Sequence, residues 1–89
     1  MKRIYESIPV RSVLYVTGGF EFVQIYDFEN EYELSKGKDS TKYTVVFNGW
    51  VRNSHSLPDK IDRAKIRRIN TVGGVLRISI CTRMDEYEK

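Results

Sequence analysis

The stretch that decides the expected fold is residues 20–34, which read FEFVQIYDFENEYEL. From Asp27 to Glu33 every odd position is acidic, while the even positions of the stretch are mostly aromatic. Successive side chains of a strand point to opposite faces, so an alternation of period two predicts a strand. Its fifteen residues exceed the usual strand length of about three to ten. The strand is therefore expected to bend or break between Asp27 and Asn30, as strands do where a sheet curls, and a bent strand is favoured.

Three two-residue turn signals divide the rest of the chain: Gly18-Gly19, Asn48-Gly49 and Gly73-Gly74. Glycine supplies the positive φ angles that tight hairpin turns require, and Asn-Gly between apolar residues is the strongest short hairpin signal. We expect the first turn to pair residues 10–16 with residues 20–34. The second is expected to join residues 43–47 to residues 50–52.

The third turn predicts a register as well as a hairpin. Centred on Gly73-Gly74, it places Ile69 opposite Ile78 and Thr71 opposite Leu76 on one side. Its reverse side carries two polar pairs, which are Arg68 with Ser79 and Asn70 with Arg77. The aliphatic side is expected to face the core.

The remaining segments are short. Pro58 in a first turn followed by Asp59 at the positive end of the helix dipole predicts a one- or two-turn helix over residues 58–64. The polar, aperiodic residues 35–42 predict a mobile loop, and the charged residues 82–89 predict a frayed tail. Residues 1–89 are expected to form a single domain.

The fold class predicted from these elements is mainly β, or α+β at most. We expect a small antiparallel, curved sheet or barrel-like roll of about five to six strands with one short helix. A flat sheet covered by the helix is the alternative. With 89 residues, 40% of them hydrophobic and 30% charged, the chain lies in the range of globular proteins and outside that of disordered ones.

Cysteine content and hydropathy indicate the cellular compartment in which the protein is expected. Cys81 is the single cysteine and has no partner for an internal disulfide, and the start of the chain lacks the apolar run of a secretory signal. No run approaches the roughly 18 apolar residues of a membrane span. The sequence therefore predicts a cytoplasmic protein that does not use a membrane.

Few residues offer catalytic or metal-binding chemistry. The one histidine, His55, lies between Ser54 and Ser56 in an expected loop, and a solvent-facing loop histidine is favoured over a catalytic one. One cysteine with one histidine cannot complete a tetrahedral metal site. The glycine pairs lack the continuation that phosphate-binding and dinucleotide-binding loops need. A row of carboxylates along a strand is more typical of a soluble sheet edge than of an active site. The sequence predicts a protein that is not an enzyme and that uses no cofactor and no metal.

Charge is distributed unevenly along the chain. Residues 17–34 carry five acids and no base, whereas residues 36–83 carry eleven bases and three acids. Guanidinium groups match phosphate oxygens in pairs, and small polar donors beside them add contacts. The sequence thus predicts a small non-catalytic binding module that contacts nucleic-acid phosphates through a basic patch of sheet and helix. The predicted residues are Lys60, Arg63, Lys65, Arg67, Arg68 and Arg77.

Aromatic residues could complete such a surface. Exposed rings stack with bases in proteins that bind single strands. The candidates for a stacking platform are Tyr15, Phe22, Tyr26, Tyr43 and Trp50. Aromatic residues at a period of two are, however, more often part of a core, and this interpretation is favoured for Phe20, Phe22 and Phe28.

The alternative hypothesis is a protein–protein interaction module or a homo-oligomeric assembly module. The odd-numbered face of the long strand carries Val23 and Ile25. A small sheet often buries a second apolar face against another copy or a partner protein. Val23 and Ile25 are the predicted contacts in that case, and a dimer is the expected assembly.

Overall fold

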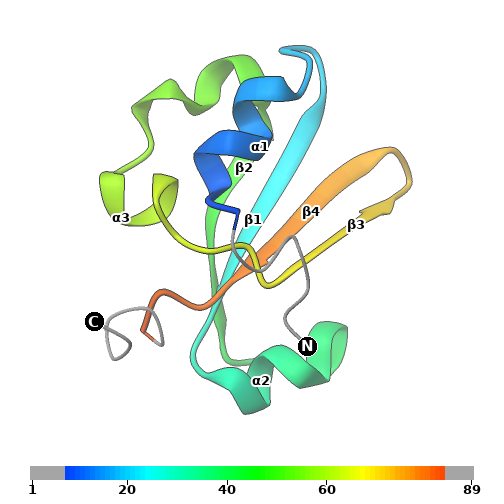
Figure 1. Cartoon of the computed structure of the whole chain (residues 1–89). Coiled ribbons are helices and arrows are strands. Elements are labelled where there is room, and N and C mark those ends of the chain that lie inside the picture. The colour runs from blue at the N-terminus through cyan, green and yellow to red at the C-terminus, as the bar shows by residue number, and fades with distance from the viewer. Residues whose placement is uncertain (1–7, 84–89) are drawn as a thin grey trace.

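The structure is a computed structural model that describes residues 8–83. It contains one open, mixed sheet of four strands in the order β2-β1-β4-β3, together with short helices, so its class is α+β. The two outer pairs are antiparallel, and the central pair, β1 with β4, is parallel (Figure 1). The elements are α1 (Val10–Val16), β1 (Phe22–Phe28), α2 (Glu31–Lys36), η2 (Gly37–Asp39), β2 (Tyr43–Trp50), η3 (Val51–Ser56), α3 (Asp59–Asp62), β3 (Arg68–Val72) and β4 (Val75–Ile80).

Two features of the predicted fold are absent from residues 8–83. The sheet there has four strands instead of five to six, and it is open, so neither a barrel nor a closed roll forms. Residues 10–16 and the second half of residues 20–34 contain helices where strands are expected. The two strands expected on either side of Asn48-Gly49 form the single strand β2.

Residues 10–16 form helix α1 instead of a strand. Val10 and Leu14 are four residues apart and both buried, which is the spacing of one helix face. The segment is also rich in valine and contains a tyrosine, residue types that are common in strands, so its local sequence suits both structures. Neither Gly18 nor Gly19 has a positive φ angle, and the predicted Gly18-Gly19 hairpin is therefore wrong.

Asn48 and Gly49 lie inside strand β2 and do not form a turn. They stand opposite Gln24 and Val23 of β1, and the φ angle of Gly49 is not positive. The predicted second hairpin is wrong, because β1 offers β2 a partner along its full length. The three residues 50–52 that follow the Asn-Gly pair are too few to provide a comparable partner.

The long strand-like stretch breaks at the predicted place, but its second half is helical. Strand β1 ends at Phe28, and Asn30 caps helix α2 by accepting a hydrogen bond from the backbone N–H of Glu33 at 2.9 Å. Asn followed three residues later by Glu is a typical start of a helix. The acidic residues 29–33 therefore do not continue as one face of a bent strand.

The third hairpin is confirmed in full. Gly73 and Gly74 have φ angles of 57° and 80°, and the strands pair Arg68 with Ser79 and Asn70 with Arg77, as the sequence predicts. The short helix after Pro58 is also present as α3.

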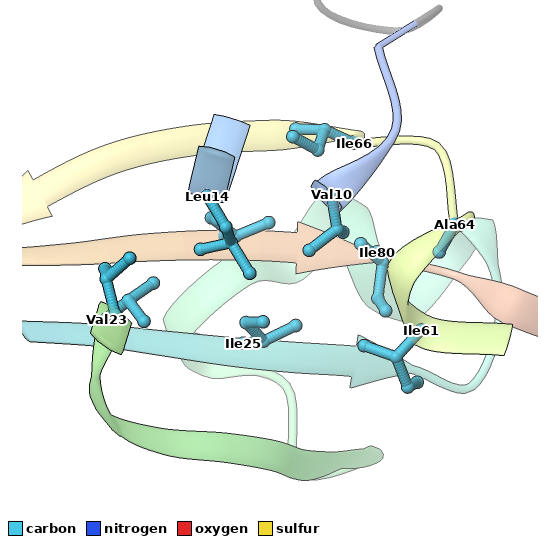
Figure 2. Packing of buried hydrophobic residues seen from close by; sticks show 10 residues of the cluster. Val10, Leu14, Val23, Ile25, Ile61, Ala64, Ile66 and Ile80 are labelled. Atoms are coloured by element: carbon cyan, nitrogen blue, oxygen red, sulfur yellow. The ribbon is translucent and has the colours of Figure 1, made fainter. Parts of the chain in front are cut away.

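The hydrophobic core lies between one face of the sheet and the helices α1 and α3. Figure 2 shows side chains of both layers converging on it. All of its buried members are aliphatic: Val10, Leu14, Val23, Ile25, Val51, Ile61, Ala64, Ile66, Ile78 and Ile80. Burying one such isoleucine or valine fully contributes about 1.5–3 kcal/mol.

The two segments expected to be mobile or frayed contain defined contacts. Residues 35–42 comprise the end of α2, the 3₁₀ turn η2 and the buried Ser40, whose hydroxyl donates to Glu33 Oε1 at 3.0 Å. At the start of the predicted tail, Thr82 donates from its backbone N–H and its hydroxyl to the carboxylate of Asp27. Residues 84–89 lie outside the described residues. No helix within residues 8–83 is long and apolar enough to span a membrane.

Candidate functional site

The face of the sheet opposite α1 and α3 is the candidate site, and we call it the outer face. Because neighbouring residues on paired strands share a face, Gln24 of β1 shares it with Asn48 of β2 and Arg77 of β4. The outer-face side chains alternate with the core residues Val23 and Ile25 along β1. They are Phe22, Gln24, Tyr26 and Phe28 of β1, Tyr43, Val45, Asn48 and Trp50 of β2, Val75, Arg77 and Ser79 of β4, and Arg68, Asn70 and Val72 of β3.

Aromatic rings occupy the β1 and β2 side of the outer face. Phe22 and Trp50 make an edge-to-face pair with ring centroids 5.2 Å apart, and Tyr26 and Tyr43 lie 5.3 Å apart. Trp50 is 41% exposed and Tyr43 is 44% exposed. These rings are therefore held by their neighbours while part of each surface remains in solvent, which corrects the interpretation that Phe22 belongs to the core.

Arg77 lies over the Tyr26 ring and is held there by one hydrogen bond. Its guanidinium carbon is 5.6 Å from the ring centroid, and its Nε donates to Gln24 Oε1 at 3.2 Å. The same Gln24 oxygen accepts a hydrogen bond from the Tyr26 hydroxyl at 2.7 Å, and Gln24 Nε2 donates to Asn48 Oδ1. An arginine over an aromatic ring gains a cation–π attraction, so this network holds a positive charge and a ring together.

A second arginine lies beside exposed rings at the other end of the outer face. Arg52, which follows β2, has its guanidinium carbon 5.8 Å from the Trp50 ring centroid and 5.2 Å from that of Phe20. Phe20 is 80% exposed, so it is not the core residue that the sequence suggested. Arg52 is not among the predicted phosphate-binding residues, because it lies outside the basic run at residues 60–68.

A hollow of about 720 Å³ opens where α2 and η2 meet the outer face. Gly37 has a φ angle of 57°, and a Cβ added there would come within 3.1 Å of Arg68 Nη1, so glycine permits this close approach. The lining includes four cationic side chains and one carboxylate. The hollow is lined by Tyr26, Phe28, Lys36, Gly37, Lys38, Asp39, Tyr43, Arg68, Asn70, Val72, Arg77 and Ser79.

The six predicted phosphate-binding residues do not form one continuous patch. Arg68 and Arg77 share the outer face. Lys60 belongs to α3 and Arg63 follows it, on the side of the sheet that the helices cover. Lys65 and Arg67 lie in the connection between α3 and β3. A run of basic residues in the sequence thus divides between two faces, because the chain crosses from one layer to the other within it.

The predicted protein-contact residues lie in the core. Val23 and Ile25 have no exposed surface, because α1 and α3 cover this face of the sheet (Figure 2). Their selection as contacts with another copy is corrected accordingly. The covering helix α1 occupies residues that the sequence predicts to be a strand.

The residues considered for catalysis or metal binding do not assemble. His55 is exposed on η3, with its Nδ1 3.2 Å from the backbone oxygen of Arg52. Within residues 8–83 no group of three or more histidine, cysteine or acidic side chains is placed to hold a metal ion. Asp27 accepts hydrogen bonds from Thr82, and Glu33 is paired with Lys36 at 3.3 Å.

Comparison of the chain with protein-family models, with curated proteins and with solved structures found no match in any of the three. The geometry and chemistry of the outer face therefore provide the basis for inferring a function.

Proposed function

We propose that the protein is a non-catalytic module that binds single-stranded nucleic acid on the outer face of its sheet, with little readout of base sequence. The observation that carries this proposal is the arrangement of partly exposed rings beside arginines, in particular Arg77 over Tyr26 and Arg52 beside Trp50. Sheets that expose aromatic side chains next to cations suit single strands, whose unpaired bases are free to stack.

Each part of the surface supplies one component of binding. Trp50 and Tyr43 expose about two fifths of their surface, so part of each aromatic side chain is available to contact a base. Stacking on an aromatic side chain contributes about 1–3 kcal/mol per base and tolerates any sequence. Arg68 and Arg77 offer guanidinium groups to the phosphates between stacked bases. Asn70 and Ser79 stand opposite these arginines and add neutral hydrogen-bonding groups.

The test is a titration of labelled single-stranded and duplex oligonucleotides, followed by fluorescence anisotropy at several salt concentrations. Single strands are expected to bind more tightly than duplexes. Each phosphate contact contributes about −0.7 to the slope of log K against log salt for a single strand. The double variant R68A/R77A is therefore expected to make that slope less negative by about 1.4.

A matched control carries the same loss of charge on the opposite side of the molecule. K60A/R63A removes two basic residues at α3, outside the outer face. Its slope is expected to stay close to that of the unaltered protein. Equal slopes for the two double variants would show that overall charge, and not the outer face, governs binding.

The single tryptophan provides an independent readout. Because Trp50 is the one tryptophan of the chain and lies on the outer face, its intrinsic fluorescence reports what happens there. Stacking of a base on the ring is expected to quench this fluorescence at the same oligonucleotide concentrations that raise the anisotropy. Binding without any change in tryptophan fluorescence would place the ligand elsewhere.

A second candidate is self-association through strand β2. This strand lies at one end of the sheet order, is eight residues long and exposes Val45 to 47%. An exposed strand edge is a template for pairing with another strand. Sedimentation at high micromolar concentration tests this candidate: a dimer that Val45→Lys dissociates supports it, and a strict monomer rejects it.

A further inference from the structure

We propose that the hollow between η2 and the sheet receives the phosphorylated end of a bound single strand, an inference that rests on the function proposed above. The outer face differs at its two ends. Beside Phe22 and Trp50 it is bordered by exposed side chains, including Phe20. At the other end lies α2 (Figure 1). Residues of α2 and η2 form one wall of the hollow there. A strand that lies along β1 therefore meets a wall at this end.

The size of the hollow suits a single nucleotide. Its volume of about 720 Å³ falls within the range of about 300–1,000 Å³ that is typical of small-ligand sites. Tyr26 and Tyr43 lie in its lining with their ring centroids 5.3 Å apart, tilted by 57°. Such a pair offers aromatic surface for one base, and the polar part of the lining is left for the sugar and the phosphate.

The charge of the hollow selects a terminal phosphate over an internal one. Lys36, Lys38, Arg68 and Arg77 line it together with the single carboxylate of Asp39. A phosphate monoester carries about −1.5 to −2 charges at neutral pH, whereas each phosphate within a strand is a diester with one charge. The excess of cations is therefore matched better by the end of a phosphorylated strand than by its interior.

The cations differ in how far they are engaged by the protein. The Nζ atom of Lys36 lies 3.3 Å from Glu33 Oε2 and 4.6 Å from the centre of the Tyr32 ring, so the charge of Lys36 is partly neutralised. Lys38 is exposed on η2 and lies in the lining of the hollow. Arg68 is brought against η2 at Gly37. We expect Lys38 and Arg68 to supply the contacts to the terminal phosphate.

The experiment compares internally labelled oligonucleotides of one sequence that carry a 5′-phosphate, a 3′-phosphate or no terminal phosphate. One of the two phosphorylated strands is expected to bind about tenfold more tightly than the unphosphorylated strand, which is the gain of one good charge-assisted contact. The measured quantity is the ratio of these two affinities. Equal affinities for all three strands would overturn the inference and leave the proposed function intact.

Two variants locate the effect within the outer face. Lys38→Ala is expected to bring the affinity ratio from about ten to about two, since it removes one of the cations facing the terminal phosphate. Trp50→Ala, at the far end of the outer face, is expected to weaken the phosphorylated and unphosphorylated strands by the same factor and to keep the ratio. A ratio that falls with Trp50→Ala but not with Lys38→Ala would overturn the assignment of the hollow.

Adenosine 5′-monophosphate is used as a competitor, because a free nucleotide and a phosphorylated strand end both present a phosphate monoester. It is expected to displace the phosphorylated strand only at concentrations at least a hundredfold above the dissociation constant of that strand, because it lacks the contacts along the outer face. Equal affinity for the free nucleotide would overturn strand-end recognition. If no strand binds at low salt, the proposed function fails and this inference fails with it.

Discussion

The two faces of the sheet are built from different kinds of side chain, although the same strands supply both. Along β1 the residues Val23 and Ile25 face the core, and Phe22, Gln24 and Tyr26 alternate with them on the outer face. The buried cluster is entirely aliphatic. In the part of the chain that the structure describes, Phe28 is the one aromatic residue that is buried. Aliphatic residues thus fill the buried core, whereas the described aromatic residues other than Phe28 keep at least part of their surface exposed.

Alanine substitutions on the two faces are expected to give the largest contrast in stability. Ile78→Ala removes a fully buried side chain of β4 and is expected to lower the free energy of unfolding by about 2–5 kcal/mol, through lost burial and the cavity that remains. Val72→Ala, in the neighbouring strand β3, removes a side chain that is 49% exposed. Its expected cost is below about 1 kcal/mol. Urea unfolding measures the loss of stability in both variants. Similar losses would show that the two faces do not differ in their contribution to stability.

The covering of the inner face depends on a contact between its helices. Arg11 of α1 donates from Nε and Nη2 to Asp62 Oδ1 of α3, at 3.2 and 2.8 Å, and from Nη2 to the backbone oxygen of Ser54. Arg11→Ala is expected to reduce the free energy of unfolding by about 1–2 kcal/mol. The exposed neighbour Ser12 provides the control, because Ser12→Ala is expected to change the free energy of unfolding by less than about 0.5 kcal/mol. Thermal unfolding of the two variants would contradict the pairing if their midpoints were the same.

The wall at one end of the outer face depends on a helix cap. Asn30→Ala removes the side chain that accepts from the Glu33 backbone N–H and is expected to cost about 1 kcal/mol. Ser35→Ala, in the same helix, removes an exposed hydroxyl that donates to the backbone oxygen of Tyr32. It is expected to lower the free energy of unfolding by less than about 0.5 kcal/mol. Hydrogen exchange of the α2 amides checks the local effect, and unchanged exchange in Asn30→Ala would show that the cap does not hold this helix.

The smallest expected change in stability lies on the outer face itself. Tyr26→Phe removes the hydroxyl that donates to Gln24 Oε1 and keeps the ring under Arg77, so we expect a cost of about 0.5 kcal/mol and little loss of affinity for single strands. Tyr26→Ala removes the ring as well and is expected to weaken binding by about 1–3 kcal/mol. Urea unfolding and anisotropy together test this pair. Equal affinities for the two variants would show that the Tyr26 ring does not stack with a base.

Some elements could be predicted because their signals are local. The hairpin of β3 and β4 follows from Gly73-Gly74, whose positive φ angles belong to the turn alone. Its register also identified Arg68 and Arg77 as neighbours of Asn70 and Ser79 on one face. The sequence predicts a bend or break between Asp27 and Asn30 and favours a bent strand. The cap signal of Asn30 with Glu33 indicates the helix that forms there instead.

Other elements depend on contacts between distant residues. Val10–Val16 fits both a helix and a strand, and burial of Val10 and Leu14 against the sheet decides between them. Asn48-Gly49 would form a turn if β2 had no partner, yet β1 pairs with it throughout. The parallel pairing of β1 with β4 has no local signal at all, and without it neither the place of Arg77 over Tyr26 nor the hollow beside η2 can be predicted.

The parallel pair at the centre of the sheet also bears on the order of folding. Gln24 and Arg77, which it brings together, are separated by 53 positions in the chain. Closing so long a loop is slow in comparison with forming a hairpin, so β1 with β2 and β3 with β4 are expected to associate first as separate units. The outer face exists only after these two halves have joined. A partly folded chain would therefore present neither the rings beside the arginines nor the hollow, and ligand binding would report completion of the fold.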